Sequence, residues 1–154
     1  MTDTSATPPE IAARQRWMGI LAEATPSALE DALARQGALP PHDALRAPEV
    51  GSALVRGRTG GTGAPFNLGE MTITRCAVTL EGRTGFGYVA GRNRRHAELA
   101  ALFDALLQDD ARRPHLERTV ITPLAAARDA ARAERSRKAA ASRVEFFTLV
   151  RGDD

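Results

Sequence analysis

The sequence predicts a single α+β domain in which a small, mostly antiparallel sheet of about four strands packs with helices on one of its faces. Apolar stripes at helical spacing occur towards both ends of the chain, whereas segments rich in Thr, Val and Ile, separated by glycines, occupy its middle. A length of 154 residues is that of one domain, and hydrophobic and charged fractions of 43% and 26% are those of a globular protein.

The first two helices are predicted at residues 10–24 and 26–36. The dipeptide Thr25-Pro26 places an N-cap residue before a proline at the first helical position. Gly37 is suited to end this second helix, because glycine readily adopts the left-handed conformation found there. Residues 1–9 are small, polar and acidic, and we expect them to form a disordered tail before the domain.

The middle of the chain is predicted to form three strands. They are residues 50–56, 70–80 and 84–90. Residues 38–48 contain three prolines and are expected to be a connector into the first strand. Residues 57–69 are predicted to form a long glycine-rich loop, and residues 81–83 a tight turn.

Three further helices are predicted after the strands. One covers residues 95–108, one begins at Pro114 and one covers residues 124–143. The last of these is rich in alanine and basic residues, so it buries little area against its own domain. Residues 144–150 are predicted to form a final strand that is apolar on both faces and therefore covered on both sides, by this chain or another. Its candidate contacts with a partner are Phe146, Phe147, Leu149 and Arg151.

Cysteine content and hydropathy narrow the class of protein. Cys76 is the only cysteine, which excludes an intramolecular disulfide and a cysteine-held metal centre. The first residues lack the basic and apolar regions of a signal peptide, and no apolar run approaches the ~20 residues of a membrane span. We therefore expect a cytoplasmic protein without a metal, a cofactor or a membrane anchor.

The glycine-rich loop is the first candidate site. Glycines allow the backbone to approach a ligand closely, and successive amide groups in such a turn can bind an anion. The loop leads into a strand and lacks the Gly-Lys-Ser/Thr ending of a P-loop, so a structural or interface role is the alternative. The candidate residues are Arg56, Arg58, Gly60, Gly61, Thr62 and Gly63.

A second candidate site is the basic turn before the helix at residues 95–108. Basic side chains are unfavourable in a first helical turn, and a bound anion or acidic partner would explain them. Residues 50–95 contain seven arginines and two glutamates, so positive charge is concentrated there. A solvated basic surface is the alternative. The candidate residues are Arg75, Arg92, Arg94, Arg95, His96 and Glu98.

Other motifs predict no catalytic site. The run Gly85–Ala90 fits G-x-G-x-x-A by letters, but it lies within a predicted strand and opens no helix. His96-Ala97-Glu98 matches H-x-E of the zinc deaminases, but no P-C-x-x-C follows. A lone strand cysteine such as Cys76 is usually a small core residue.

Several short motifs occur in an order that resembles one family. They are Arg16-Trp17-Met18, Gly60-Gly61-Thr62-Gly63, Thr74-Arg75, Gly91-Arg92, His96-Ala97-Glu98, Asp104-Ala105-Leu106, Pro123-Leu124 and the run from Ser142 to Gly152. Together they resemble PhnG, a small subunit of the bacterial carbon–phosphorus lyase system. The resemblance covers roughly residues 12–153, and neither the N-terminal tail nor Pro40-Pro41 has a counterpart.

The resemblance implies an accessory subunit that has no catalytic activity alone. PhnG proteins join PhnH, PhnI and PhnJ in a core complex, and PhnL acts with them. With PhnI, PhnH and PhnL, PhnG supports formation of α-D-ribose 1-methylphosphonate 5-triphosphate from ATP and methylphosphonate in organic phosphonate catabolism. Contact with ATP or the phosphonate is therefore possible at the candidate sites, and the iron–sulfur chemistry of the system belongs to PhnJ.

Two other classes of function remain as alternatives. A nucleic-acid-binding module would use the basic hairpin or the helix at residues 124–143. Against it, the helix after Pro26 carries Glu30 and Asp31 with only Arg35, and aromatic residues for base stacking are sparse. The third interpretation is an independent transferase, which would turn over ATP and a phosphonate without partners.

Overall fold

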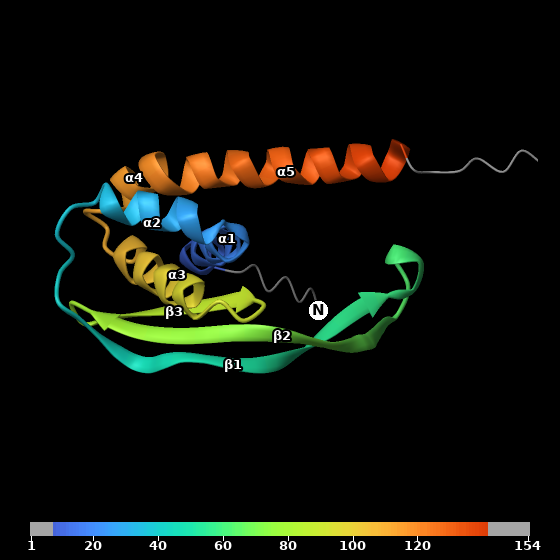
Figure 1. The fold of residues 1–154 in the computed structure, drawn as a ribbon, viewed down its shortest axis with the longest axis horizontal. Coiled ribbons are helices and arrows are strands. Elements are labelled where there is room, and N and C mark those ends of the chain that lie inside the picture. The colour runs from blue at the N-terminus through green and yellow to red at the C-terminus, as the bar shows by residue number, and fades with distance from the viewer. Residues whose placement is uncertain (1–7, 142–154) are drawn as a thin grey trace, which may run out of the picture.

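The computed structural model describes residues 8–141 as a three-stranded antiparallel sheet, in the order β1-β2-β3, with the helices on one face (Figure 1). The strands are β1 (His42–Arg58), β2 (Pro65–Leu80) and β3 (Arg83–Ala90). The helices are α1 (Pro9–Glu23), α2 (Pro26–Ala34), α3 (Arg94–Leu107), α4 (Arg113–Leu116) and α5 (Thr122–Ala141), with the 3-10 turn η1 (Thr59–Gly61) and the short π-helix η2 (Glu117–Ile121). The α+β class is confirmed, and the predicted strand at residues 144–150 lies outside the described residues.

The residues predicted to begin and end the second helix are found at its ends. Thr25 Oγ1 accepts a hydrogen bond from the amide of Ala28 and so caps α2. Gly37 follows that helix with a φ of 76°, in the left-handed region. The predicted first, second and third helices agree with α1, α2 and α3 to within two residues at each end.

Helix α3 is the centre of the domain. It contacts β2 and β3 on one side and α1 and α2 on the other, so its side chains are buried nearly all round. Leu99, Phe103 and Leu107 have no exposed surface. Trp17 and Leu21 of α1 complete this core, in which aliphatic side chains predominate.

Two glycines allow α3 to lie directly on β3. A Cβ atom at Gly85 would be 2.0 Å from the carbonyl oxygen of Ala101, and one at Gly87 would be 2.0 Å from that of Ala97. Neither distance is possible for a real side chain. The G-x-G letters of this strand therefore serve the packing of a helix on a sheet.

The prediction for residues 38–69 was wrong in its boundaries. The expected connector at 38–48 and loop at 57–69 are mostly strand, because β1 already begins at His42 and β2 begins at Pro65. The ladder shifts register between Arg46 and Glu49, so Pro48 falls in an irregular part of an edge strand, where it breaks no regular pairing. The result is one long hairpin in place of a short strand and a long loop.

Helix α5 packs apolar side chains against the core only near its start. None of its residues is buried, and Leu124 and Ala125 are those that pack against the core. An ion pair between Arg132 and Glu23 joins it to α1 further along. Among the described residues, no helix is both long enough and apolar enough to cross a membrane.

Candidate functional site

The outer part of the long hairpin extends beyond the rest of the sheet. The last residue of β3, Ala90, lies opposite Ile73, so past this point β2 pairs with β1 alone. We call residues 52–72 the hairpin arm. Figure 1 shows it projecting on the same side of the molecule as the end of α5. A two-stranded ribbon of this kind is marginally stable in water unless something packs on it.

The hairpin arm exposes large apolar side chains. Leu54 and Leu68 are 65% and 66% exposed, and Phe66 and Met71 are 45% and 40% exposed. The ring of Phe66 lies over Gly57, where it would be 3.2 Å from an added Cβ. Several large apolar side chains exposed on one projecting segment are a feature of interaction sites. The arm is therefore the strongest candidate for contact with another protein.

The predicted glycine-rich site forms the tip of this arm. Gly60 and Gly61 have φ values of 61° and 83°, and the amide of Gly63 donates a 2.8 Å hydrogen bond to the carbonyl of Thr59. Arg58 Nη1 donates a hydrogen bond to the carbonyl oxygen of Gly63 at 3.3 Å, and this bond stabilises the turn. Thr62 and Arg56 are exposed beside it. The glycines are thus explained by the shape of the turn, and anion binding there stays a prediction.

In the predicted basic turn at the start of α3, some residues form hydrogen bonds or ion pairs with other described residues and some do not. Asn93 caps the helix by accepting a 2.9 Å hydrogen bond from the amide of His96. The His96 ring is buried, with Nε2 3.0 Å from the carbonyl oxygen of Leu21. Arg92 and Arg94 form no ion pair with any described residue.

The other arginines of this set are held by carboxylates. Arg95 bonds to Glu30 of α2 at 2.7 Å and to Glu98 at 2.8 Å. These bonds raise the pKa of Arg95 and lower that of Glu30. Arg75 pairs with Glu49, whose pKa is lowered by hydrogen bonds from Arg46 and from Arg75.

The structure does not bring the two predicted basic sites together. The turn after β3 lies beside Thr72, since the amide of Gly91 donates to the carbonyl of that residue. From Ile73 to the start of β2 at Pro65 the strand spans roughly 26 Å. One ligand of metabolite size therefore cannot contact both the tip of the arm and Arg92 or Arg94.

Sequence reasoning missed the buried carboxylate of Asp104. Its side chain is fully buried and accepts hydrogen bonds from Arg14, from the indole N–H of Trp17 at 2.8 Å and from the amide of Phe86 at 2.9 Å. The available signal was an acidic residue among the apolar positions of the helix at residues 95–108. Because it is fully buried and joins α1, α3 and β3, Asp104 serves the fold.

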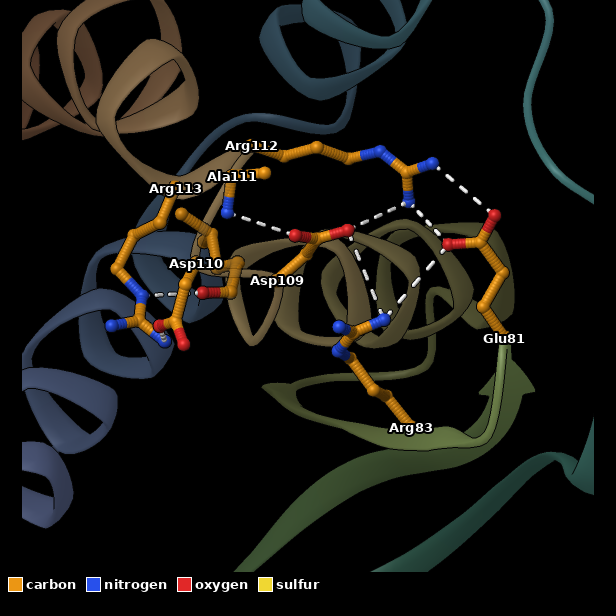
Figure 2. A network of polar contacts seen from close by, with 8 residues as sticks. Glu81, Arg83, Asp109, Asp110, Ala111, Arg112 and Arg113 are labelled. Atoms are coloured by element: carbon orange, nitrogen blue, oxygen red, sulfur yellow. Dashed lines mark hydrogen bonds and ion pairs between the residues drawn. The ribbon is translucent and has the colours of Figure 1, made fainter.

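A network of charged side chains lies at the β2–β3 turn, at the end of the sheet opposite the hairpin arm. Arg112 Nη1 lies 2.6 Å from Glu81 Oε2 and 3.4 Å from Asp109 Oδ2. Figure 2 shows Arg112 between these two carboxylates, with Arg83 close to both. Hydrogen bonding from Arg112 lowers the pKa of Glu81, and the amide of Ala111 contributes most to the lowered pKa of Asp109. The network ties the β2–β3 turn to the segment after α3.

The environment of Cys76 does not activate its thiol as a nucleophile. The thiol is buried and lies 3.4 Å from the carbonyl oxygen of Arg46, and burial, with the charge of Glu98, raises its pKa. Residues 8–141 contain no group of three side chains placed to hold a metal ion. The predicted contacts Phe146, Phe147, Leu149 and Arg151 lie outside the described residues.

Comparison with known proteins identifies the family. A family profile described as "Phosphonate metabolism protein PhnG" matches residues 12–152. The "Alpha-D-ribose 1-methylphosphonate 5-triphosphate synthase subunit PhnG" of Rhizobium meliloti (strain 1021) is 42% identical over 145 residues, which cover 94% of this chain and 92% of the relative. The resemblance of its motifs is thereby confirmed, and the chain belongs to the PhnG family of phosphonate metabolism proteins.

Proposed function

We propose that this chain is an accessory subunit of the enzyme that forms α-D-ribose 1-methylphosphonate 5-triphosphate from ATP and methylphosphonate. The relative from Rhizobium meliloti is named as a subunit of that synthase. The single observation that carries the proposal is the hairpin arm, whose exposed leucines and phenylalanine have no cover within residues 8–141. A surface of this kind is expected of a subunit and is unfavourable in a protein that works alone.

The charged and nucleophilic groups support a non-catalytic role for the chain by itself. Among residues 8–141 the buried titratable groups are Asp104, His96 and Cys76, of which the first two are bonded within the fold and the third has a raised pKa. General acid–base or nucleophilic catalysis requires such groups to face a substrate. The catalytic groups of the synthase are then supplied by other subunits.

The proposed partners are PhnI, PhnH and PhnJ in a core complex, with PhnL acting alongside them in the cytoplasm. Arg92 and Arg94 are the side chains most available for a phosphate-bearing substrate or an acidic partner surface, because neither is paired with a described acid. The tip of the arm, with Arg56, is the second such position. Each contact remains part of the proposal.

Co-expression of the tagged chain with PhnI, PhnH and PhnJ of its source, followed by native mass spectrometry, tests the proposal. We expect a stable assembly that contains this chain. A well-folded monomer that copurifies with none of them would overturn the subunit role. In that case, binding of nucleic acid at low salt, measured on the same monomer, distinguishes the basic nucleic-acid-binding module from a protein of another class.

A further inference from the structure

Strand β3 is an edge of the sheet, and its first half is capped by side chains. The amide of Phe86 donates to Asp104 Oδ2 at 2.9 Å, and the carbonyl of Thr84 accepts from Arg14 Nη2 at 3.1 Å and Gln108 Nε2 at 2.8 Å. The backbone groups of the even-numbered residues therefore point away from β2, as alternation in an antiparallel ladder requires.

The capping stops after Phe86. By the same alternation, the N–H and C=O groups of Tyr88 and Ala90 also point outwards, and no described side chain bonds to them. Tyr88 is 51% exposed. Edge strands are usually protected by a charge, a proline or a bulge, but residues 85–90 contain no charged residue or proline and pair with β2 in unbroken register.

An apolar groove runs beside this open edge. It has a volume of about 230 Å³ and lies between α1, α3 and β3. None of its lining residues is charged: Met18, Gly19, Leu21, Ala22, Phe86, Tyr88 and Ala100. The groove can receive apolar side chains from a segment that bonds to the edge, and it would exclude charged ones because nothing in it could pair with them.

Positive charge lies just past the open end of the strand. Arg92 and Arg94 follow Ala90 within four residues and form no ion pair with a described residue. Arg14, near the capped end, is already bonded to Asp104. Charge complementarity therefore favours an acidic residue only at the end of the incoming segment that meets Arg92 and Arg94.

We propose that the open edge of β3 at Tyr88 and Ala90 binds an extended segment of another subunit, which adds a strand to the sheet. The segment carries apolar residues at alternate positions, which enter the groove beside Gly19, and an acidic residue that faces Arg92 or Arg94. This mode of recognition combines main-chain hydrogen bonds with side-chain pockets. The inference rests on the proposed subunit role and adds to it a second contact surface, separate from the hairpin arm.

Hydrogen exchange at the amides of Tyr88 and Ala90 tests the inference directly. In the assembly with the co-expressed subunits, we expect both amides to exchange at least about tenfold more slowly than in the isolated chain, because each gains a hydrogen bond. Unchanged exchange at both amides in an intact assembly would overturn the inference and leave the subunit role standing. Failure of the chain to assemble at all would overturn both.

Gly19 offers a matched pair of variants. Gly19 is exposed and an added Cβ there meets nothing within 4 Å, so a side chain can be introduced without a clash at its first atom. Gly19→Glu places a charge in the groove, and we expect it to lower recovery of the chain in the assembly by at least about tenfold. Gly19→Ala, and Gln15→Glu on the exposed surface of α1, should leave recovery unchanged. Equal recovery of Gly19→Glu and Gly19→Ala would contradict the proposal.

Two other occupants give different results. If the chain's own residues after Ala141 were the occupant, the two amides would be protected in the isolated chain and would lose protection on truncation after Ala141. If a second copy were, protection would rise with the concentration of the isolated chain. Either result overturns the assignment to another subunit.

Discussion

Arg14 and Asp104 form a bidentate ion pair that joins α1 to α3, with Nε–Oδ1 and Nη2–Oδ2 distances of 3.1 and 2.7 Å. The carboxylate also accepts from Trp17 and from the backbone of Phe86. One buried charge thus connects α1, α3 and the edge of β3. The same contacts decide which part of that edge is capped and which part is left open.

Replacement of this carboxylate should destabilise the fold strongly. Asp104→Asn removes the negative charge and turns one acceptor into a donor that faces Arg14 and Trp17. We expect the free energy of unfolding, measured with urea, to fall by about 3 kcal/mol or more, as for other broken buried ion pairs. Asp110→Asn is the control, because that side chain is 90% exposed, and it should change stability by less than about 0.5 kcal/mol. Similar small effects from both substitutions would contradict the structural role of Asp104.

The contact between α3 and β3 predicts a large effect from one methyl group. Gly87→Ala would place Cβ 2.0 Å from a helix carbonyl oxygen, so helix and strand must separate. We expect a loss of roughly 1–3 kcal/mol in the free energy of unfolding. Gly51→Ala is the matched control, because it makes the same change in a strand where nothing lies within 4 Å of the added atom. Comparable stability of the two variants would show that α3 does not lie directly on β3.

The charged network of Glu81, Asp109 and Arg112 predicts a pH dependence. The pKa of Glu81 is lowered in the folded protein from an ordinary value of 4.5, mainly by Arg112. A group with a lowered folded pKa stabilises the protein above its unfolded pKa, and this contribution disappears as the pH falls through the folded value. We expect the stability of Glu81→Gln to fall less than that of the wild type when the pH is lowered from neutral to below 4.5. Parallel pH profiles of the melting temperature would show that this network contributes nothing.

The hairpin arm predicts a loss of assembly without a loss of folding. Leu54→Ser together with Leu68→Ser should change the free energy of unfolding by less than about 0.5 kcal/mol, because both side chains are already exposed to water. We expect the doubly substituted chain to fail to copurify with PhnI, PhnH and PhnJ. Leu45→Ser is the control, because Leu45 is equally exposed, at 65%, but lies outside the arm. Normal recovery of the double variant would remove the arm from the interface.

The sequence by itself determined the local elements and the family. Helix boundaries followed from Thr25-Pro26, Gly37 and the apolar stripes, since capping and helical periodicity are properties of neighbouring residues. The turn after β2 was predicted from Glu81-Gly82, and both residues have positive φ. The order of short motifs, ending in residues 142–152, was enough to indicate the family.

Only the tertiary structure decided how far the hairpin extends and which charged residues remain unpaired. Prolines and glycines at residues 38–48 and 57–69 predict a connector and a loop, yet pairing between β1 and β2 makes most of both segments strand. Arg95 and Arg92 are alike in sequence, but Glu30, distant along the chain, binds only the first of them among the described residues. Pairing, burial and ion-pair choice depend on residues brought together by folding, so a local pattern cannot specify them.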